Sequence, residues 1–82
     1  MSIIDNLSLV SDASVLSFGG DSEVTLTHVH DTGLLLNSTN AIQFGDSGTF
    51  INQSGNGILN LTSDGSIDLN VGANGVLIKG TT

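Results

Sequence analysis

The chain has 82 residues, a net charge of −7, and Lys79 as its only basic side chain. A single basic residue cannot neutralise a row of phosphates, so the composition argues against binding to nucleic acid or to anionic lipid. The chain contains no Cys, which excludes disulfides and cysteine metal sites. Its longest purely apolar runs have three residues, far fewer than a membrane span needs. No basic segment precedes an apolar stretch near the N-terminus, so we expect no signal peptide.

The length allows a single domain, residues 1–82, and the composition predicts that it folds. Hydrophobic residues make up 38% of the chain and charged residues only 11%, whereas acidic disordered segments are poor in hydrophobic residues. Most of the polar residues are Ser, Thr, Asn and Gly. This mixture is typical of short strands joined by tight turns.

Apolar and polar residues alternate in the first half of the chain, which is the pattern of β-strands. No segment repeats apolar residues at helical spacing, so we expect no helix. The alternation predicts strands at residues 2–10, 14–18, 23–30 and 33–36.

From residue 41 onward the predicted strands follow one another every eight to ten residues. They are residues 41–44, 49–52, 58–61, 66–71 and 76–79, and turns rich in Gly and Asn separate them. The segment Leu16–Ser22 also resembles Ile42–Ser47 in sequence, which indicates repetition. Repetition at a short period without long connections favours a β-solenoid over a sandwich or a barrel.

We predict an all-β fold in which three identical chains intertwine as a β-helix or a β-prism. One chain of short strands encloses little volume, and small scaffolds without disulfides often need oligomerisation. Intertwining also pairs the strand edges that would otherwise promote aggregation. The alternatives are a single-chain parallel β-solenoid and a small sandwich or barrel.

The most distinctive candidate site is the pair His28 and His30 in the segment 23–30. Alternate residues of a strand share a face, so both imidazoles extend the apolar row of Val24 and Leu26. In a trimer the pair gives six imidazole nitrogens around the axis, a set suited to Fe, Zn or Ni. The simpler interpretation is that both histidines lie in solvent at a strand end, beside Asp31.

Other candidate sites have simpler explanations as turns. Asp21 and Glu23 are too close together on a narrow strand to flank a substrate across a cleft. The segments 46–48 and 63–65 match no calcium-binding loop. No nucleophile motif or phosphate-binding loop is present either, so we expect a protein that is not an enzyme.

Two parts of the chain resemble structural proteins of bacteriophage tails. The segments 15–19, 24–29, 31–37 and 40–48 resemble tail-fibre and virion proteins of marine bacteriophages. The segment 65–80 is similar to the trimeric β-helices of contractile-tail spikes. The resemblance implies a homotrimeric, rod-like module of the virion that serves host attachment or envelope penetration. Phage fibres also bind metal through His-x-His motifs from three chains, and this pattern maps onto His28 and His30.

The sequence therefore predicts a stiff, non-enzymatic shaft or tip module of a phage tail fibre or spike. Its partners would be two further copies of itself, other tail proteins, and a glycan or receptor on the host surface. The alternatives are a fibre module that binds carbohydrate or receptor, and a self-assembling filament or capsid decoration protein. A glycan-binding surface usually presents aromatic side chains, and the chain has only three Phe and no Trp or Tyr.

Overall fold

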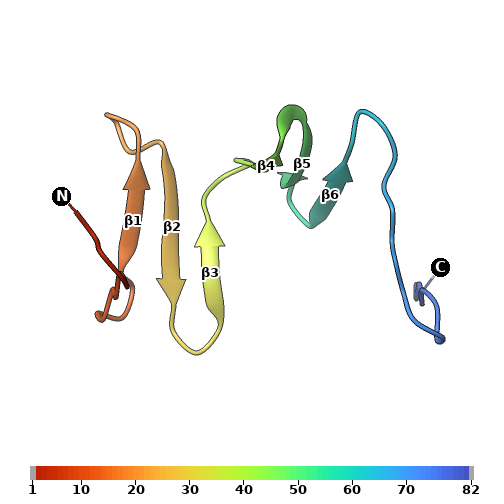
Figure 1. The fold of residues 1–82 in the computed structure, drawn as a ribbon, viewed down its shortest axis with the longest axis horizontal. Helices are drawn as coiled ribbons and strands as arrows, with labels where there is room; N and C mark the ends of the chain where they lie inside the picture. The colour runs from red at the N-terminus through yellow and green to blue at the C-terminus, as the bar shows by residue number, and fades with distance from the viewer. Residues whose placement is uncertain (1, 82) are drawn as a thin grey trace.

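The computed structural model describes residues 2–81 and shows an all-β chain with two separate three-stranded sheets. No helix occurs among the described residues, and therefore no helix long and apolar enough to cross a membrane. The two sheets follow one another along the longest axis of the molecule (Figure 1). The all-β class predicted from the alternation is confirmed.

The first sheet contains β1 (Val15–Phe18), β2 (Val24–Val29) and β3 (Gly33–Leu36), in that order. Both neighbouring pairs are antiparallel, with Leu16 opposite Leu26 and Leu26 opposite Leu36. Because opposite residues lie on the same face, these three leucines form one apolar row across the sheet. All three are partly shielded from solvent.

The second sheet contains β4 (Ile42–Phe44), β5 (Asp46–Gly55) and β6 (Ile58–Thr62), again in chain order and antiparallel. Its apolar row consists of Ile42, Ile51 and Leu61, which lie opposite one another across the three strands. All three of these side chains are exposed.

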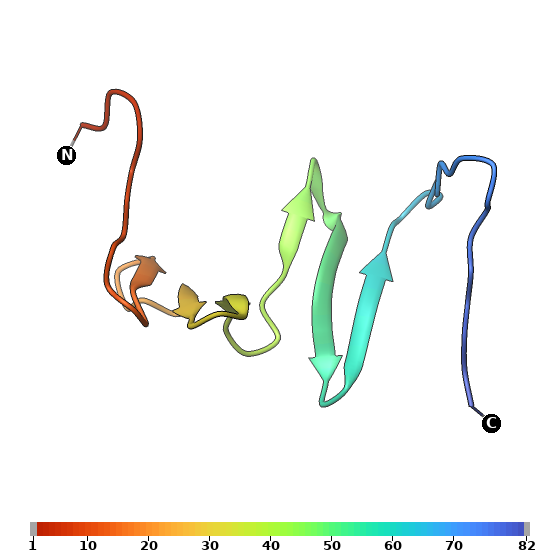
Figure 2. The ribbon, with the colours of Figure 1, turned by 90° about the horizontal axis from the view of Figure 1, so that it is seen from below.

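Antiparallel pairing within each sheet rules out the alternative of a single-chain parallel β-solenoid. The two sheets also run in different directions. The strands of the first sheet are seen lengthwise in Figure 1 and end-on in Figure 2, whereas those of the second sheet are lengthwise in Figure 2. The chain therefore changes direction at the connection between β3 and β4.

The segments outside the two sheets form no strands within the chain. Residues 2–10, 66–71 and 76–79, for which alternation predicts strands, are extended and exposed. A strand needs a partner for its backbone hydrogen bonds, and these segments have none among the described residues. The prediction of strands there is not met within one chain.

The chain has no hydrophobic core of its own. Not one of the described residues is buried, and 22 large hydrophobic side chains are exposed. The radius of gyration is 16.6 Å, whereas a compact domain of this length has about 12 Å. The molecule is therefore open, with extents of 45 × 31 × 30 Å.

Candidate functional site

The histidine pair lies where β2 ends. His28 is on the face of β2 that carries Leu26, and it is partly shielded, whereas His30 follows the strand in an exposed turn. The two rings face each other edge to face, with centroids 6.4 Å apart. The prediction that both histidines extend the row of Val24 and Leu26 is therefore met by His28, whereas His30 lies beyond the end of β2.

A carboxylate from another part of the chain joins the pair. Asp12 Oδ1 lies 3.5 Å from His30 Nδ1 and 3.9 Å from His28 Nδ1, and Asp31 Oδ2 lies 3.3 Å from His30 Nε2. Both carboxylates are largely exposed, so solvent weakens these contacts. Asp12 was not predicted as part of this site, because it lies 16 residues before His28 and no local pattern connects the two.

His28 also connects the segment before β1 to β2. Its Nδ1 accepts a hydrogen bond from the Ala13 backbone N–H at 3.3 Å, and its backbone N–H donates to the Ser14 carbonyl at 2.8 Å. An Nδ1 that accepts this hydrogen bond carries no proton, so the Nε2 atom of a neutral His28 bears it. In this arrangement His28 orients the chain where it enters β1.

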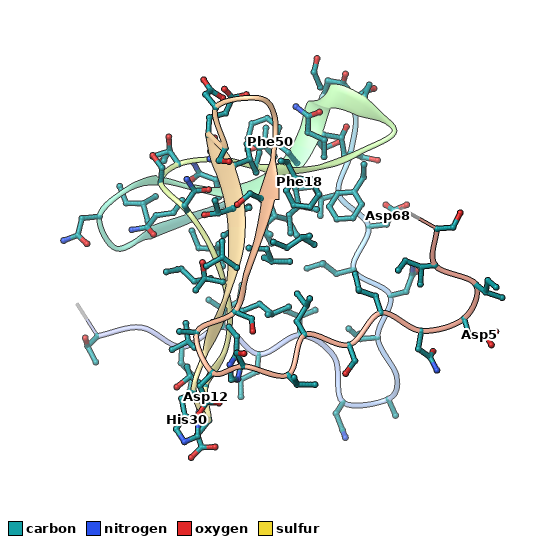
Figure 3. The ribbon with its side chains drawn as sticks, turned by 90° about the vertical axis from the view of Figure 1, so that its left-hand side faces the viewer. Asp5, Asp12, Phe18, His30, Phe50 and Asp68 are labelled. Atoms are coloured by element: carbon teal, nitrogen blue, oxygen red, sulfur yellow. The ribbon has the colours of Figure 1, made fainter. Side chains whose placement is uncertain are left out.

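The structure gathers no metal-binding group of three or more His, Asp or Glu side chains within residues 2–81. In Figure 3, which looks along the long axis, His30 and Asp12 lie together at the outer end of the first sheet, well away from Phe18. Three chains would have to bring their histidines together to complete the predicted site at His28 and His30, and that site stays a prediction.

The carboxyl groups of Asp21 and Glu23 interact in the turn between β1 and β2. This side-chain interaction lowers the pKa of Asp21 and raises the pKa of Glu23. The physical cause is the hydrogen bond that protonated Glu23 donates to ionised Asp21. Both groups are exposed to solvent. The arrangement fits a charged turn before β2, as the sequence indicated.

The two candidate calcium turns use their polar atoms for local hydrogen bonds. Asp46 Oδ1 accepts the Gly48 backbone N–H at 3.0 Å, and Ser63 Oγ accepts the Gly65 backbone N–H at 3.1 Å. The Asp64 carboxylate lies so close to Gly48 that a Cβ there would be 2.7 Å from Asp64 Oδ2. These contacts fix the turns at the start of β5 and at the end of β6.

The connection between the two sheets is held by asparagines. Asn37 Oδ1 accepts the Thr25 backbone N–H at 2.8 Å, and Asn37 Nδ2 donates to the Glu23 carbonyl at 2.9 Å. Asn40 Nδ2 donates to Asn37 Oδ1 at 3.0 Å and to the Glu23 carbonyl at 3.2 Å. The side chains thus tie residues 37–40 to the start of β2. The sequence marked these residues only as the end of a strand.

An open apolar hollow of about 230 Å³ lies on the second sheet. Its lining includes Phe44, Phe50, Ile51, Leu61 and Ile67. Apolar atoms dominate this surface, and no charged side chain lines it, so it offers no acid, base or metal ligand. It is suited to an apolar partner surface rather than to a polar substrate.

Comparison with known proteins does not assign the chain to a family. No family model, no curated protein and no solved structure matched it. The fold and its surface thus define only a class: an all-β chain of two antiparallel sheets whose apolar side chains face solvent.

Proposed function

We propose that the protein is a non-enzymatic structural module that acts as a homotrimer, with each chain completing the hydrophobic core of the others. The observation that carries this proposal is the absence of any buried side chain among residues 2–81, together with 22 exposed large hydrophobic residues. An exposed apolar area of this size is typical of a surface that binds a protein partner.

The amount of exposed surface indicates how large the missing contacts are. The chain exposes 7061 Å², whereas a compact monomer of its mass exposes about 4,600 Å². The excess of about 2,500 Å² is some three times the roughly 800 Å² that each partner contributes to a standard interface. Contacts of this size are typical of obligate assemblies, in which folding and association occur together.

The role we infer for the trimer is a stiff shaft or tip segment of a bacteriophage tail fibre or spike. The resemblance of the segments 15–48 and 65–80 to tail-fibre and spike proteins supports this role. The elongated arrangement of the sheets is also compatible with a rod (Figure 1). A host glycan or receptor and neighbouring tail proteins remain the proposed partners, and the virion the proposed location.

Sedimentation equilibrium of the purified chain tests the proposal. We expect a single species of three chains, about 25 kDa, at micromolar concentration, with a cooperative thermal transition. The chain mass of 8.3 kDa makes monomer, dimer and trimer easy to distinguish. A folded monomer with a sharp thermal transition would contradict the proposal, because it would require a core that one chain lacks.

A further inference from the structure

The three-stranded unit of the first sheet recurs in the second sheet with a spacing of 26 residues. The first strands of the two units, β1 and β4, end at Phe18 and Phe44. A glycine with positive φ follows each of them, Gly19 at 89° and Gly45 at 85°. Positive φ favours glycine because it has no Cβ, so in both units the turn begins at a glycine directly after the first strand. The turn has five residues in the first unit and Gly45 alone in the second.

The connections that lead into each unit recur with the same spacing. Residues 11–14 and 37–40 are turns in which the backbone N–H of the fourth residue donates to the carbonyl of the first, at 3.2 and 3.3 Å. At residues 63–66 a side chain closes the turn instead, because the Ser63 hydroxyl donates to the Ser66 carbonyl at 3.1 Å. The first two precede β1 and β4. The third precedes residues 67–71, which therefore occupy the position of a first strand. The extended C-terminal segment has the sequence position of a third unit.

Successive units lie on different sides of the long axis. In Figure 3, which looks along this axis, the first sheet, the second sheet and the pale-blue C-terminal segment occupy different sides, and Phe18 points inward. Strands are spaced about 4.8 Å apart, so a three-stranded sheet covers about 14 Å. The molecule is 45 Å long. On any one side, a single chain therefore covers about a third of the length and leaves space for two more sheets.

The sheet edges that border this space are unpaired and unprotected. The Asn37 backbone N–H donates to the Thr25 carbonyl, so these two residues form a hydrogen-bonded pair. In an antiparallel ladder such pairs alternate with pairs that are not hydrogen-bonded to each other, so the backbone groups of Leu34 and Leu36 point away from β2. They form the free edge of β3. Neither β3 nor β4 contains a charge or a proline, the features that normally prevent edges from pairing.

We propose that the free edge of β3 in one copy pairs with the free edge of β4 in a second copy. This inference rests on the proposed homotrimer and names the strands that join it. Rotation about a threefold axis along the molecule places the second sheet of one copy beside the first sheet of its neighbour. Three β3–β4 contacts then close a ring, because each copy offers one strand to each of the other two.

Engineered disulfides test this pairing in a chain that has no cysteine of its own. Leu35→Cys, on the solvent-exposed face of β3, is combined in turn with Ile42→Cys, Gln43→Cys or Phe44→Cys on β4. A disulfide needs Cα atoms about 4.4–6.8 Å apart, which paired neighbouring strands provide. After oxidation we expect at least one pair to give a covalent species of three chains on a denaturing gel. Each single variant should give no covalent trimer.

The matched control replaces Leu35→Cys by Thr27→Cys, because β2 already has partners on both edges. A β2 position lies about 10 Å from the neighbouring copy, too far for a disulfide. Circular dichroism confirms that each variant is folded before oxidation.

The outcomes separate the pairing from the trimer itself. A trimer in solution that gives no covalent trimer with any of the three pairs overturns the β3–β4 contact and leaves the homotrimer intact. A ladder of growing oligomers on the gel overturns the closed ring. A monomer in solution before oxidation contradicts the proposed function as well.

Discussion

The paired middle of the chain and its two flanking segments share one sequence pattern but have different structures. Residues 15–62 form six hydrogen-bonded strands, whereas the flanking segments 2–10 and 67–81 form no strand with any other described residue. Both regions alternate apolar and polar residues. Leu69 and Val71 repeat with the same period as Leu16 and Phe18.

The difference shows that alternation encodes the readiness to form a strand and leaves the choice of partner open. In the middle of the chain short turns bring neighbours together, so each strand finds its partner locally. At the ends no neighbour is left. If three chains assemble as we propose, the flanking segments acquire their partners from other copies.

The largest expected effect comes from a charge placed on the inner face of the first sheet. Leu36→Asp puts a carboxylate into the row of Leu16 and Leu26, and we expect it to abolish the trimer, since a buried unpaired charge is strongly destabilising. The control is Leu35→Asp, one residue earlier on the opposite and exposed face. Sedimentation should show a trimer for the control alone. Equal loss in both variants would contradict the assignment of faces.

A smaller effect is expected in the C-terminal flank. Leu69 lies outside both sheets and is 61% exposed, so an isolated chain should tolerate Leu69→Asp. If the segment 67–71 is buried between copies, each chain loses about 1.5–3 kcal/mol of burial and gains a desolvated charge. We expect a clear drop in the thermal midpoint of the trimer, measured by circular dichroism, whereas Asn70→Asp should change it little. An unchanged midpoint for Leu69→Asp would show that this flank is free.

The strands themselves were largely predictable from local pattern. Gly33–Leu36 matches its predicted bounds, and β2 differs from the prediction by one residue at each end. β5 is longer than predicted, because a single glycine, Gly45, turns the chain and Asp46 already pairs with Phe44. The residues between Asp46 and Phe50 lie in a register shift of the β4–β5 ladder. The Asn56–Gly57 hairpin similarly needs only two residues. Between residues 15 and 62, local preference predicted where strands form.

The tertiary features were not predictable in this way. The contact of Asp12 with the histidines, and the bonds of Asn37 to the start of β2, join residues far apart in sequence. The alternation of apolar and polar residues does not indicate contacts between residues so far apart in sequence. The arrangement of the two sheets depends on the Asn37 bonds, because they fix the connection at residues 37–40.

A moderate effect is expected when the connection between the sheets is loosened. Asn37→Ala leaves the Thr25 backbone N–H without its acceptor and removes one of the two hydrogen bonds that Asn40 Nδ2 donates, at a cost of about 1–3 kcal/mol per chain. Asn37→Asp keeps the acceptor oxygen and loses only the donor to Glu23, so it should cost less. Asn56→Ala, in a turn with no such side-chain bonds, is the control. Chemical denaturation that ranks Asn37→Asp below Asn37→Ala in stability would contradict this account.

The smallest expected effect is a pH dependence in the turn between β1 and β2. Because the pKa of Glu23 is raised, this group stabilises the fold at low pH, and the contribution is lost as the pH rises through the raised pKa. Because the pKa of Asp21 is lowered, that group stabilises the fold at higher pH, and its contribution is lost as the pH falls through the lowered pKa. Both contributions are complete only between the ordinary pKa values of the two groups, 3.8 for Asp21 and 4.5 for Glu23. Glu23→Gln donates the same hydrogen bond at every pH, so a shallow maximum of the thermal midpoint near pH 4 should become a plateau that extends toward neutral pH. Asp5→Asn, in the exposed N-terminal segment, should leave the maximum in place. A maximum that survives in Glu23→Gln would show that other groups cause it.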